Sequence, residues 1–575
     1  MWDAKCARTI GYMYLRQSNQ KRADGSVLSH LQIAENVWDP VKKRSRVRIL
    51  HNCGRSDDPK AAERLRRLAR SILKRCSPEE LVADDPSLRV VDTWPYGDVY
   101  VLEHLWRRVG LPELISELLD NRRFEFSIER ALFAMVANRA CAPSSKLYCH
   151  EQWLAEDVRI EGCEALELHH LYRAMDFLEA HKEVLEEALY FRMADLLNLD
   201  VEVVFYDTTS LHFEVDEEDA GVGEDDEVRG SQAAGAKTYR AVRKRGKSKN
   251  GRGDVPQVMV GLAVTRDGFP VRHWVFPGNT VDVTTVAKVK AELKGWRLNR
   301  CVFVGDAGMV SAQNLRTLAR GGGRYIVCMP VHRGGEVDTE VVSRRGRYRE
   351  VAENLQVKEV VVGEGERRRR YVVCFNPREA ERQRNHRAQV LTELEAELAT
   401  VRECSGGEHS KRVCELRASG RYGRYIRLTD TGRPVLDRAK VKAAERMDGK
   451  FVVHSNDDTL SAEDMALGYK QLQRVEQAWR QLKSGLRLRP VYHRAVHRIH
   501  AHIALTVIAL LLERMAEHAC ADTWRNIRDD LKGVQLAQLI GANGTIWQVT
   551  EPRPSASKRL KSLQISPPPP ILKLS

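Results

Sequence analysis

The stretch VEVVFYDTTSLHFE, residues 201–214, decides the fold class. It is rich in β-branched and aromatic residues, which predicts a buried strand, and it carries one acid in its middle, Asp207. A second apolar stretch, CVFVGDAG at 301–308, predicts another buried strand that ends on Asp306 at a glycine-containing turn. A carboxylate in a buried strand is costly unless it is paired or bound to a metal ion.

The segments around these two strands predict an α/β domain. PQVMVGLAVT and FPVRHWVF, joined by Arg266-Asp267-Gly268, predict a β-hairpin. DVTTVAKVKAELKGW predicts a helix with Asp282 as its N-cap, SAQNLRTLARGGG a second helix, and RYIVCMP a further strand. The order along the chain is therefore β-β-β-α-β-α-β, with one carboxylate in the first strand and one at the end of the fourth.

The rest of the chain divides by pattern into further regions. Apolar residues at i, i+3 and i+4 predict a helical domain before the first acid, and short strands around a charged helix predict a β-rich insertion after the second. The tail is polar, ends in four prolines, and is expected to be loose. The predicted regions are a small N-terminal β-rich element with a basic helix (1–90), a helical domain proposed to bind DNA ends (91–200), a first core part (201–330), the insertion (331–455), a second core part (456–520) and the tail (521–575).

The stretch SAEDMALGYKQLQRVEQAWRQLK, residues 461–483, predicts one long helix that carries a third acid. Five of its residues share one face by helical spacing, namely Tyr469, Leu472, Glu476, Trp479 and Lys483. An aromatic residue, a carboxylate and a lysine on one stripe are unusual for a plain core helix. They suit a face that contacts a nucleic-acid strand, with the lysine on a phosphate.

Composition bounds the function. The chain has 575 residues, enough for three or four domains, and 43% of them are apolar. Lysine and arginine number 93 against 79 acids, so the net charge of +14 favours a polyanionic partner. The apolar run 503–512 is too short to span a membrane and is expected to be a buried helix, and no secretory signal is evident, so we expect a cytoplasmic protein without a membrane partner.

Less specific readings compete with these. A single aspartate at a strand end is more often a turn or helix cap than a functional group. Basic clusters are often solvated faces, although a DNA-cutting core would make them phosphate contacts; they are Arg367–Arg370, Lys237–Arg252 and the pair Arg487 and Arg489. His493, His497 and His500 could suggest a metal site but fit a basic helix face better, and Cys404, His409 and Cys414 lack the paired spacing of a zinc site.

The ordered blocks resemble a known family. The chain is similar to bacterial insertion-sequence transposases of the DDE type, in the group whose signature is Y-x2-R-x3-E-x6-K. The signature reads Tyr469, Leu472, Glu476 and Lys483 here, so Leu472 replaces the usual arginine and one expected phosphate contact is missing. YDTTS at 206–210, VGDAGMVSAQNL at 304–315, PGNTVDVTT at 277–285 and RLRPVYHRAVHRIHAH at 487–502 also resemble the family, and the likeness runs from about residue 95 to 515.

The resemblance implies a multidomain α/β protein with a ribonuclease-H-like core, a β-rich insertion, a preceding helical domain and a small N-terminal β element. It implies that Asp207, Asp306 and Glu476 are catalytic and bind two Mg²⁺ or Mn²⁺ ions. Such ions, about 4 Å apart, can activate a water or a 3′-OH for attack on a phosphodiester. Tyr469 and Lys483 would grip DNA near the cut phosphate, with Arg487 and Arg489 as further DNA contacts.

Three functions remain open from the sequence. The first is a transposase that cleaves DNA at transposon terminal inverted repeats and joins the freed end to target DNA, as a homodimer in the synaptic complex, associated with the bacterial nucleoid when bound to DNA. The second is a transposase-derived protein that binds DNA without catalysis. The third is a stand-alone metal-dependent nuclease of the same fold, which would cut without strand transfer.

Overall fold

The computed structural model describes residues 13–21, 27–39, 42, 44–73, 87–120, 122, 124–197, 202–219, 227–229, 238–249, 251–296, 298, 301–331, 335–365, 368–541 and 544–574. The chain folds into two compact units. The first unit comprises Met1–Thr93, Ala537–Val549 and Pro569–Ser575, and the second comprises Trp94–Leu536 and Thr550–Pro568.

The first unit holds the β-rich element that the sequence predicts at the N-terminus. An antiparallel three-stranded sheet, β1-β2-β3, is followed by the helix α1. A second sheet has the order β20-β19-β18-β4, so strands from the C-terminal end pair with one that follows α1. These elements are β1 (Met13–Lys21), β2 (Val27–Asp39), β3 (Arg44–Arg55), α1 (Pro59–Leu73), β4 (Arg89–Pro95), β18 (Gln535–Gly541), β19 (Gly544–Val549) and β20 (Ile571–Leu574).

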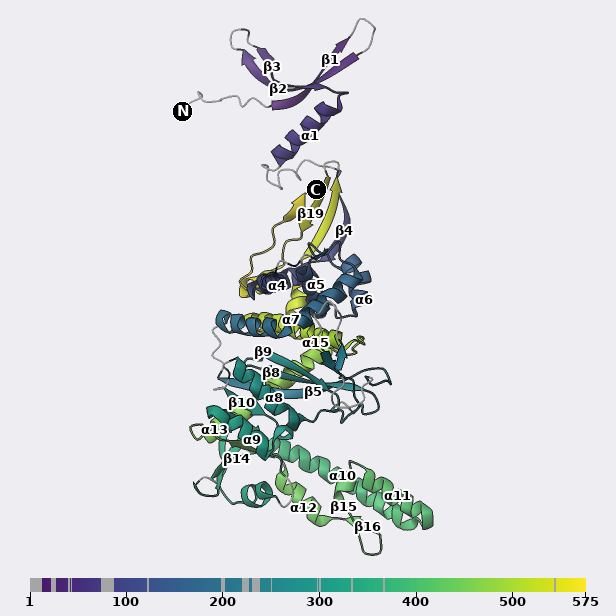
Figure 1. Cartoon of the computed structure of the whole chain (residues 1–575), viewed down its shortest axis with the longest axis vertical. Helices are drawn as coiled ribbons and strands as arrows, with labels where there is room; N and C mark the ends of the chain where they lie inside the picture. Colours follow the sequence, from purple (N-terminus) through teal and green to yellow (C-terminus); the bar gives the residue numbers. More distant parts are fainter. Residues whose placement is uncertain are drawn as a thin grey trace, which may run out of the picture. The chain divides into compact units, whose positions relative to one another are not determined.

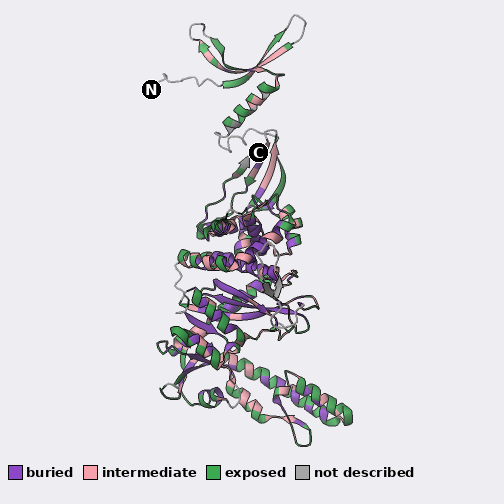
Figure 2. Cartoon of the chain, viewed as in Figure 1, coloured by how far each residue is buried: buried purple, intermediate pink, exposed green. Residues whose placement is uncertain are grey.

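Helices are present in the region 91–200, as the periodicity predicts, and they form a layer within the second unit together with the sheet (Figure 1). Its helices are α3 (Gly97–Arg108), α4 (Leu111–Leu119), α5 (Ile128–Cys141), α6 (Lys146–Tyr148), the π-helix η1 (Cys149–Asp157) and α7 (Leu168–Leu196). Their common core also includes a later helix, α15 (Val496–Cys520), which packs against α5, α7 and α3. Figure 2 shows this junction as one of the most deeply buried parts of the chain.

A nine-stranded mixed sheet lies at the centre of the second unit, in the order β12-β13-β14-β17-β11-β10-β5-β8-β9. The predicted order β-β-β-α-β-α-β is confirmed, including the antiparallel hairpin of β8 and β9. Between β5 and β8 the chain forms a small two-stranded sheet of β6 and β7. The bounds are β5 (Val203–His212), β6 (Glu227–Arg229), β7 (Thr238–Arg240), β8 (Gln257–Val264), β9 (Pro270–Pro277), α8 (Asp282–Gly295), β10 (Val302–Gly305), η4 (Ala307–Met309), α9 (Ala312–Ala319), η5 (Arg320–Gly322) and β11 (Arg324–Cys328).

The insertion differs from the β-rich segment that the sequence predicts. Its strands extend the central sheet, and the part between β14 and β17 is mainly helical (Figure 1). Buried residues on α10 follow a helical period, Val390, Leu394, Leu398 and Val401, and pack against α11, so this part has its own small core. The elements are η6 (Val337–Val342), β12 (Arg349–Ala352), β13 (Leu355–Val362), β14 (Arg369–Phe375), α10 (Pro377–Glu403), α11 (Gly406–Ala418), η8 (Gly423–Tyr425), β15 (Ile426–Leu428), β16 (Pro434–Leu436), α12 (Arg438–Met447) and β17 (Lys450–Ser455).

The tail, expected to be loose, is folded, and that prediction is wrong. Residues after 521 form α16 (Trp524–Leu531), the strands β18 to β20 and α17 (Pro554–Ser562). Leu560 and Leu563 are buried, and Tyr100 Oη on α3 donates a hydrogen bond to the carbonyl of Ser566 at 2.9 Å. A few scattered apolar residues therefore anchor the tail, although their spacing in the sequence shows no strong periodic pattern.

The apolar run 503–512 lies inside α15, as expected of a buried helix. This helix passes a length and composition test for a membrane span, but 89% of its apolar window is buried inside the protein. Its side chains contact α7, α5 and β9, so the apolar surface is accounted for by the core that joins the helical layer to the sheet.

Candidate active site

The register of two neighbouring strands brings the two predicted aspartates together. β5 and β10 run parallel, and Val304 pairs with Phe205. Two residues further along each strand are Asp306 and Asp207, so both carboxylates lie at the same height on adjacent strands. Asp207 is inside β5, whereas Asp306 follows the last residue of β10. The carboxyl ends of parallel strands are where such sheets commonly place functional groups.

Burial, together with the carboxylates of Asp306 and Asp282, raises the pKa of Asp207 to about 6, although Lys249 opposes the shift. The mutual repulsion of acids in one site is the signature of carboxylates that a cation would stabilise. The two aspartates are therefore close enough to act as one electrostatic unit.

The sequence analysis missed the roles of Lys249 and Asp282 at this site. Lys249 Nζ lies 2.9 Å from Asp282 Oδ2 and 3.9 Å from Asp207 Oδ1. Thr208 Oγ1 donates to Asp282 Oδ1 at 2.6 Å, and Lys249 Nζ donates to Thr208 Oγ1 at 2.7 Å. Asp282 was predicted to cap a helix, but Val281 is the N-cap of α8 and Asp282 is its first residue. Its carboxylate instead faces the acidic site.

Tyr469 contacts the second aspartate directly. Its Oη donates a hydrogen bond to Asp306 Oδ1 at 3.0 Å. Burial, together with Cys328 and Asp306, raises the pKa of this phenol far above its ordinary value, so it remains a hydrogen-bond donor. Tyr469 therefore orients Asp306 in this structure, whereas the resemblance implied that it grips DNA.

The single helix predicted over 461–483 is interrupted. It consists of α13 (Ala462–Lys470), α14 (Gln473–Arg480) and the π-helix η9 (Gln481–Gly485). Hydrogen bonds between residues three apart, such as the one that Leu472 N donates to Tyr469 O, tighten the chain between α13 and α14. The five residues of the expected stripe differ in exposure: Leu472 and Trp479 are buried, whereas Glu476 is exposed.

Glu476 and Leu472 take different environments. Leu472, which replaces the signature arginine, is 7% exposed and belongs to the core. Glu476 lies on α14, which packs against β5 and β8, the strands around Asp207. Within the described ranges no three metal-ligating side chains are grouped closely enough to hold an ion. The structure thus joins Asp207 to Asp306 and places Glu476 on the helix beside them.

Basic residues surround the acids. Lys483 Nζ donates to Thr209 Oγ1 on β5. Burial, together with Arg489, lowers the pKa of Lys483 to about 8, although Asp207 opposes the shift. Arg489 is therefore near this lysine, whereas Arg487 is exposed on the following loop. Both arginines lie on the segment that follows η9.

The other basic and histidine candidates have separate locations. Arg370 pairs with Glu359 at 2.7 Å, while Arg367 and Lys237 lie outside the described residues. His497 and His500 contact Asp176 and Glu179 on α7, at 3.1 and 3.2 Å. These histidines thus join α15 to the helical layer.

Coupled carboxylates on adjacent strands of a mixed sheet, ringed by lysine and arginine, define an enzyme of the class that acts on phosphodiesters. The chain belongs to the DDE transposase family, because residues 214–512, more than half of its length, match the family model described as "Transposase DDE domain". Residues 15–85 match the model described as "IS1634 family transposase, N-terminal domain". The chain is therefore a DDE transposase, whose function is DNA transposition, and its N-terminal region is similar to that of IS1634 family transposases.

The match to the DDE model begins after Asp207, so the place of Asp207 rests on strand register and electrostatics. No curated protein matches the chain. Among solved structures, one described as the "piggyBac transposase synaptic complex with hairpin DNA" is similar over 75% of this chain and 77% of that chain, with 9% identity and a TM-score of 0.32. A similarity this weak carries no argument about the site.

Proposed function

We propose that this transposase cleaves DNA at terminal inverted repeats and joins the freed end to target DNA, and that it belongs to the YREK-signature group with Leu472 as a departure. The observation that carries the proposal is the position of Asp207 and Asp306 two residues beyond the pair Val304 and Phe205 on the parallel strands β10 and β5, in a chain of the DDE family. We further propose that it works in the bacterial cytoplasm, on the nucleoid, and as a homodimer when two ends are brought together.

The DDE family generally uses divalent metal ions. The donor set fits such an ion, because Asp207 and Asp306 supply hard oxygen ligands, and burial, with a smaller contribution from Asp306, raises the pKa of Asp207. We propose Glu476 as the third ligand and Mg²⁺ or Mn²⁺, two ions, as the cofactor. When bound, the metal would supply a nucleophile at neutral pH and stabilise the leaving oxygen.

The chain's own residues have distinct tasks in this proposal. Tyr469 holds Asp306 through its phenol, and Thr208 and Lys249 hold Asp282 beside Asp207. Lys483, beside Thr209 on the same strand as Asp207, would contact a phosphate near the bond to be cut. Lys249 neutralises part of the acidic charge until substrate and cofactor arrive.

The test is an end-cleavage and strand-transfer assay with the full chain and Mg²⁺. Glu476→Gln should abolish cleavage of a terminal inverted repeat while DNA binding survives, and Glu395→Gln, at an exposed position of α10, should cleave normally. Normal cleavage by Glu476→Gln would contradict the role given to this glutamate. Cleavage by the native chain without any joined product would favour a stand-alone nuclease, and binding without cleavage a non-catalytic DNA-binding protein.

A further inference from the structure

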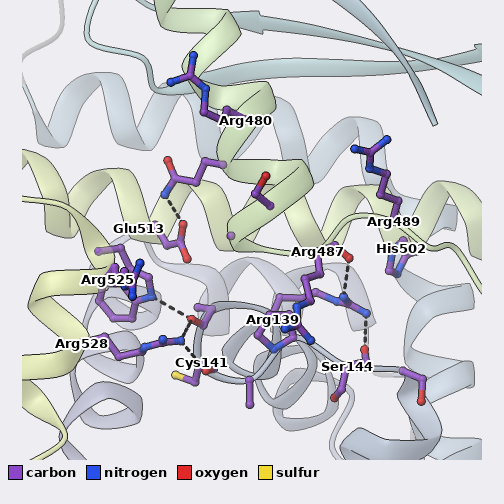
Figure 3. Close-up of a pocket in the computed structure, with 18 of the residues that line it drawn as sticks. Arg139, Cys141, Ser144, Arg480, Arg487, Arg489, His502, Glu513, Arg525 and Arg528 are labelled. Atoms are coloured by element: carbon purple, nitrogen blue, oxygen red, sulfur yellow. Dashed lines mark hydrogen bonds between the residues drawn. The ribbon is translucent and has the colours of Figure 1, made fainter. Parts of the chain in front are cut away.

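A wide basin of about 1940 Å³ opens beside the helix that carries Glu476, within the second unit (Figure 3). Its walls come from segments far apart in the sequence: the turn after α5, the end of α14 with η9, the loop at 486–493, and the end of α15 with the start of α16. The helical layer and the catalytic core therefore build it together.

The basin has an excess of unpaired positive charge. Among the lysines and arginines that line it, only Arg514 forms an ion pair with a carboxylate in the part of the chain that the structure describes; the others are Arg139, Lys146, Arg480, Arg487, Arg489, Arg525 and Arg528.

The acids that line the basin do not offset these cations. Burial raises the pKa of Glu513 to about 8, so this side chain is neutral near pH 7. Glu517 pairs with Arg514 at 2.9 Å, and Asp522 pairs with Arg559 at 2.6 Å.

Among these cations, Lys146 gives the strongest evidence for a bound ligand. It is 3% exposed, and its Nζ has no hydrogen-bond partner among the described residues. Burial, together with the nearby Arg139, lowers its pKa to about 7. A buried ammonium group without a partner costs several kcal/mol unless a ligand completes it.

Arg139 makes the surrounding wall rigid. It is 3% exposed, and its guanidinium donates to the carbonyls of Ser144 and Arg487, the latter at 3.2 Å (Figure 3). One side chain from α5 thus fixes the turn that carries Lys146 against the loop that carries Arg487. The relative position of these two cations is preorganised.

We propose that this basin binds the sugar–phosphate backbone of duplex DNA next to the catalytic carboxylates, with Lys146 as the innermost phosphate ligand and Arg525 as an outer one. The inference rests on the proposed function and adds the path of the DNA across the helical layer. Phosphate contacts fix register without reading sequence, so the basin positions the duplex for cleavage. The duplex can be the transposon end or the target.

The test compares DNA binding by full-length variants at several salt concentrations, by fluorescence anisotropy without divalent cations. The probes are two labelled 30-bp duplexes, one with the element's terminal repeat and one of unrelated sequence. Lys146→Met and Arg525→Gln are compared with Lys558→Met, an exposed lysine on α17 outside the basin. Thermal unfolding of each variant separates lost contacts from lost folding, and Arg525 is exposed, so its change leaves the core intact.

Lys146→Met should weaken binding roughly tenfold and lower the slope of log affinity against log salt by about one, as expected for one lost phosphate contact. Arg525→Gln should lower the slope similarly, and Lys558→Met should change neither quantity. A loss on the terminal-repeat duplex alone assigns the basin to the transposon end, and a loss on both duplexes assigns it to general backbone binding that includes the target. Native affinity and slope in both basin variants overturn the inference, whereas failure of the proposed function would appear as absent Mg²⁺-dependent cleavage by the native chain.

Discussion

Replacing Glu513 by glutamine should stabilise the protein at alkaline pH. Glu513 is 3% exposed in α15 and accepts a hydrogen bond from Gln481 Nε2 on η9, so it ties the catalytic segment to the core helix. Burial raises its pKa from the ordinary 4.5 to about 8. Glutamine keeps the shape and a carbonyl acceptor for Gln481 but cannot ionise.

The sign follows from proton counting. Between pH 4.5 and 8 the folded chain keeps the proton of Glu513, whereas the unfolded chain has lost it. Stability therefore falls as pH rises through this window, by about 1.4 kcal/mol per pH unit, or roughly 3–5 kcal/mol over the whole window. The glutamine variant lacks this loss.

The assay is thermal unfolding at pH 5, 7 and 8.5. The melting temperature of Glu513→Gln should exceed the native value by several degrees at pH 8.5, and the gap should close toward pH 5. Glu395→Gln, at an exposed helix position, should follow the native protein at each pH. A gap that is independent of pH, or a variant that melts below the native protein at pH 8.5, would refute the reasoning.

Two other substitutions test the site and its supporting helices. Lys249→Met should tighten Mn²⁺ binding several-fold in calorimetric titration of the DNA-free protein. The reason is that the change removes a cation that lies 2.9 Å from Asp282 and 3.9 Å from Asp207. Weaker binding than in the Lys247→Met control would contradict the role assigned to this lysine. Asp176→Asn should cost about 3–5 kcal/mol in unfolding experiments, since it leaves Arg498 and His497 without their buried carboxylate partner, and an unchanged melting temperature would count against this network.

The sequence predicted the central sheet well because its strands are continuous apolar runs. The stretches around Asp207 and Asp306 have no competing helical period, and the order of the seven core elements is confirmed. These predictions depend on local composition, which a single sequence contains. The adjacency of the two aspartates comes from the parallel pairing of β5 with β10, which the structure shows and the order of elements alone does not give.

The parts that the sequence missed depend on tertiary contacts. The break at Leu472 arises from a tightened turn that helical spacing does not reveal, and it divides the predicted helix into α13 and α14. Lys249 sits in a glycine-rich basic stretch that reads as solvated, although its ammonium group reaches the acidic site. Asp282 resembled a helix cap because its position one residue into α8 differs little from a capping position.

The insertion and the tail show a related limit. The charged helix α10 carries a stripe of buried residues that packs against α11. The strands before and after these helices join the central sheet through β17, which pairs with both β14 and β11. The polar tail holds its few apolar residues against α3 and α16, contacts that no periodic pattern announces. In both regions, pairing between distant segments decides the structure.

The most direct test of the account is Mg²⁺-dependent cleavage of a terminal-repeat duplex by Asp207→Asn, because this residue lies outside the matched family segment and is placed by strand register and electrostatics. The variant should bind the duplex with native affinity and cleave it at least about a hundredfold more slowly, since loss of a proposed metal ligand should cost no less than loss of an outer partner. Cleavage at the native rate by a correctly folded Asp207→Asn protein would contradict the assignment of Asp207 and Asp306 to one catalytic site.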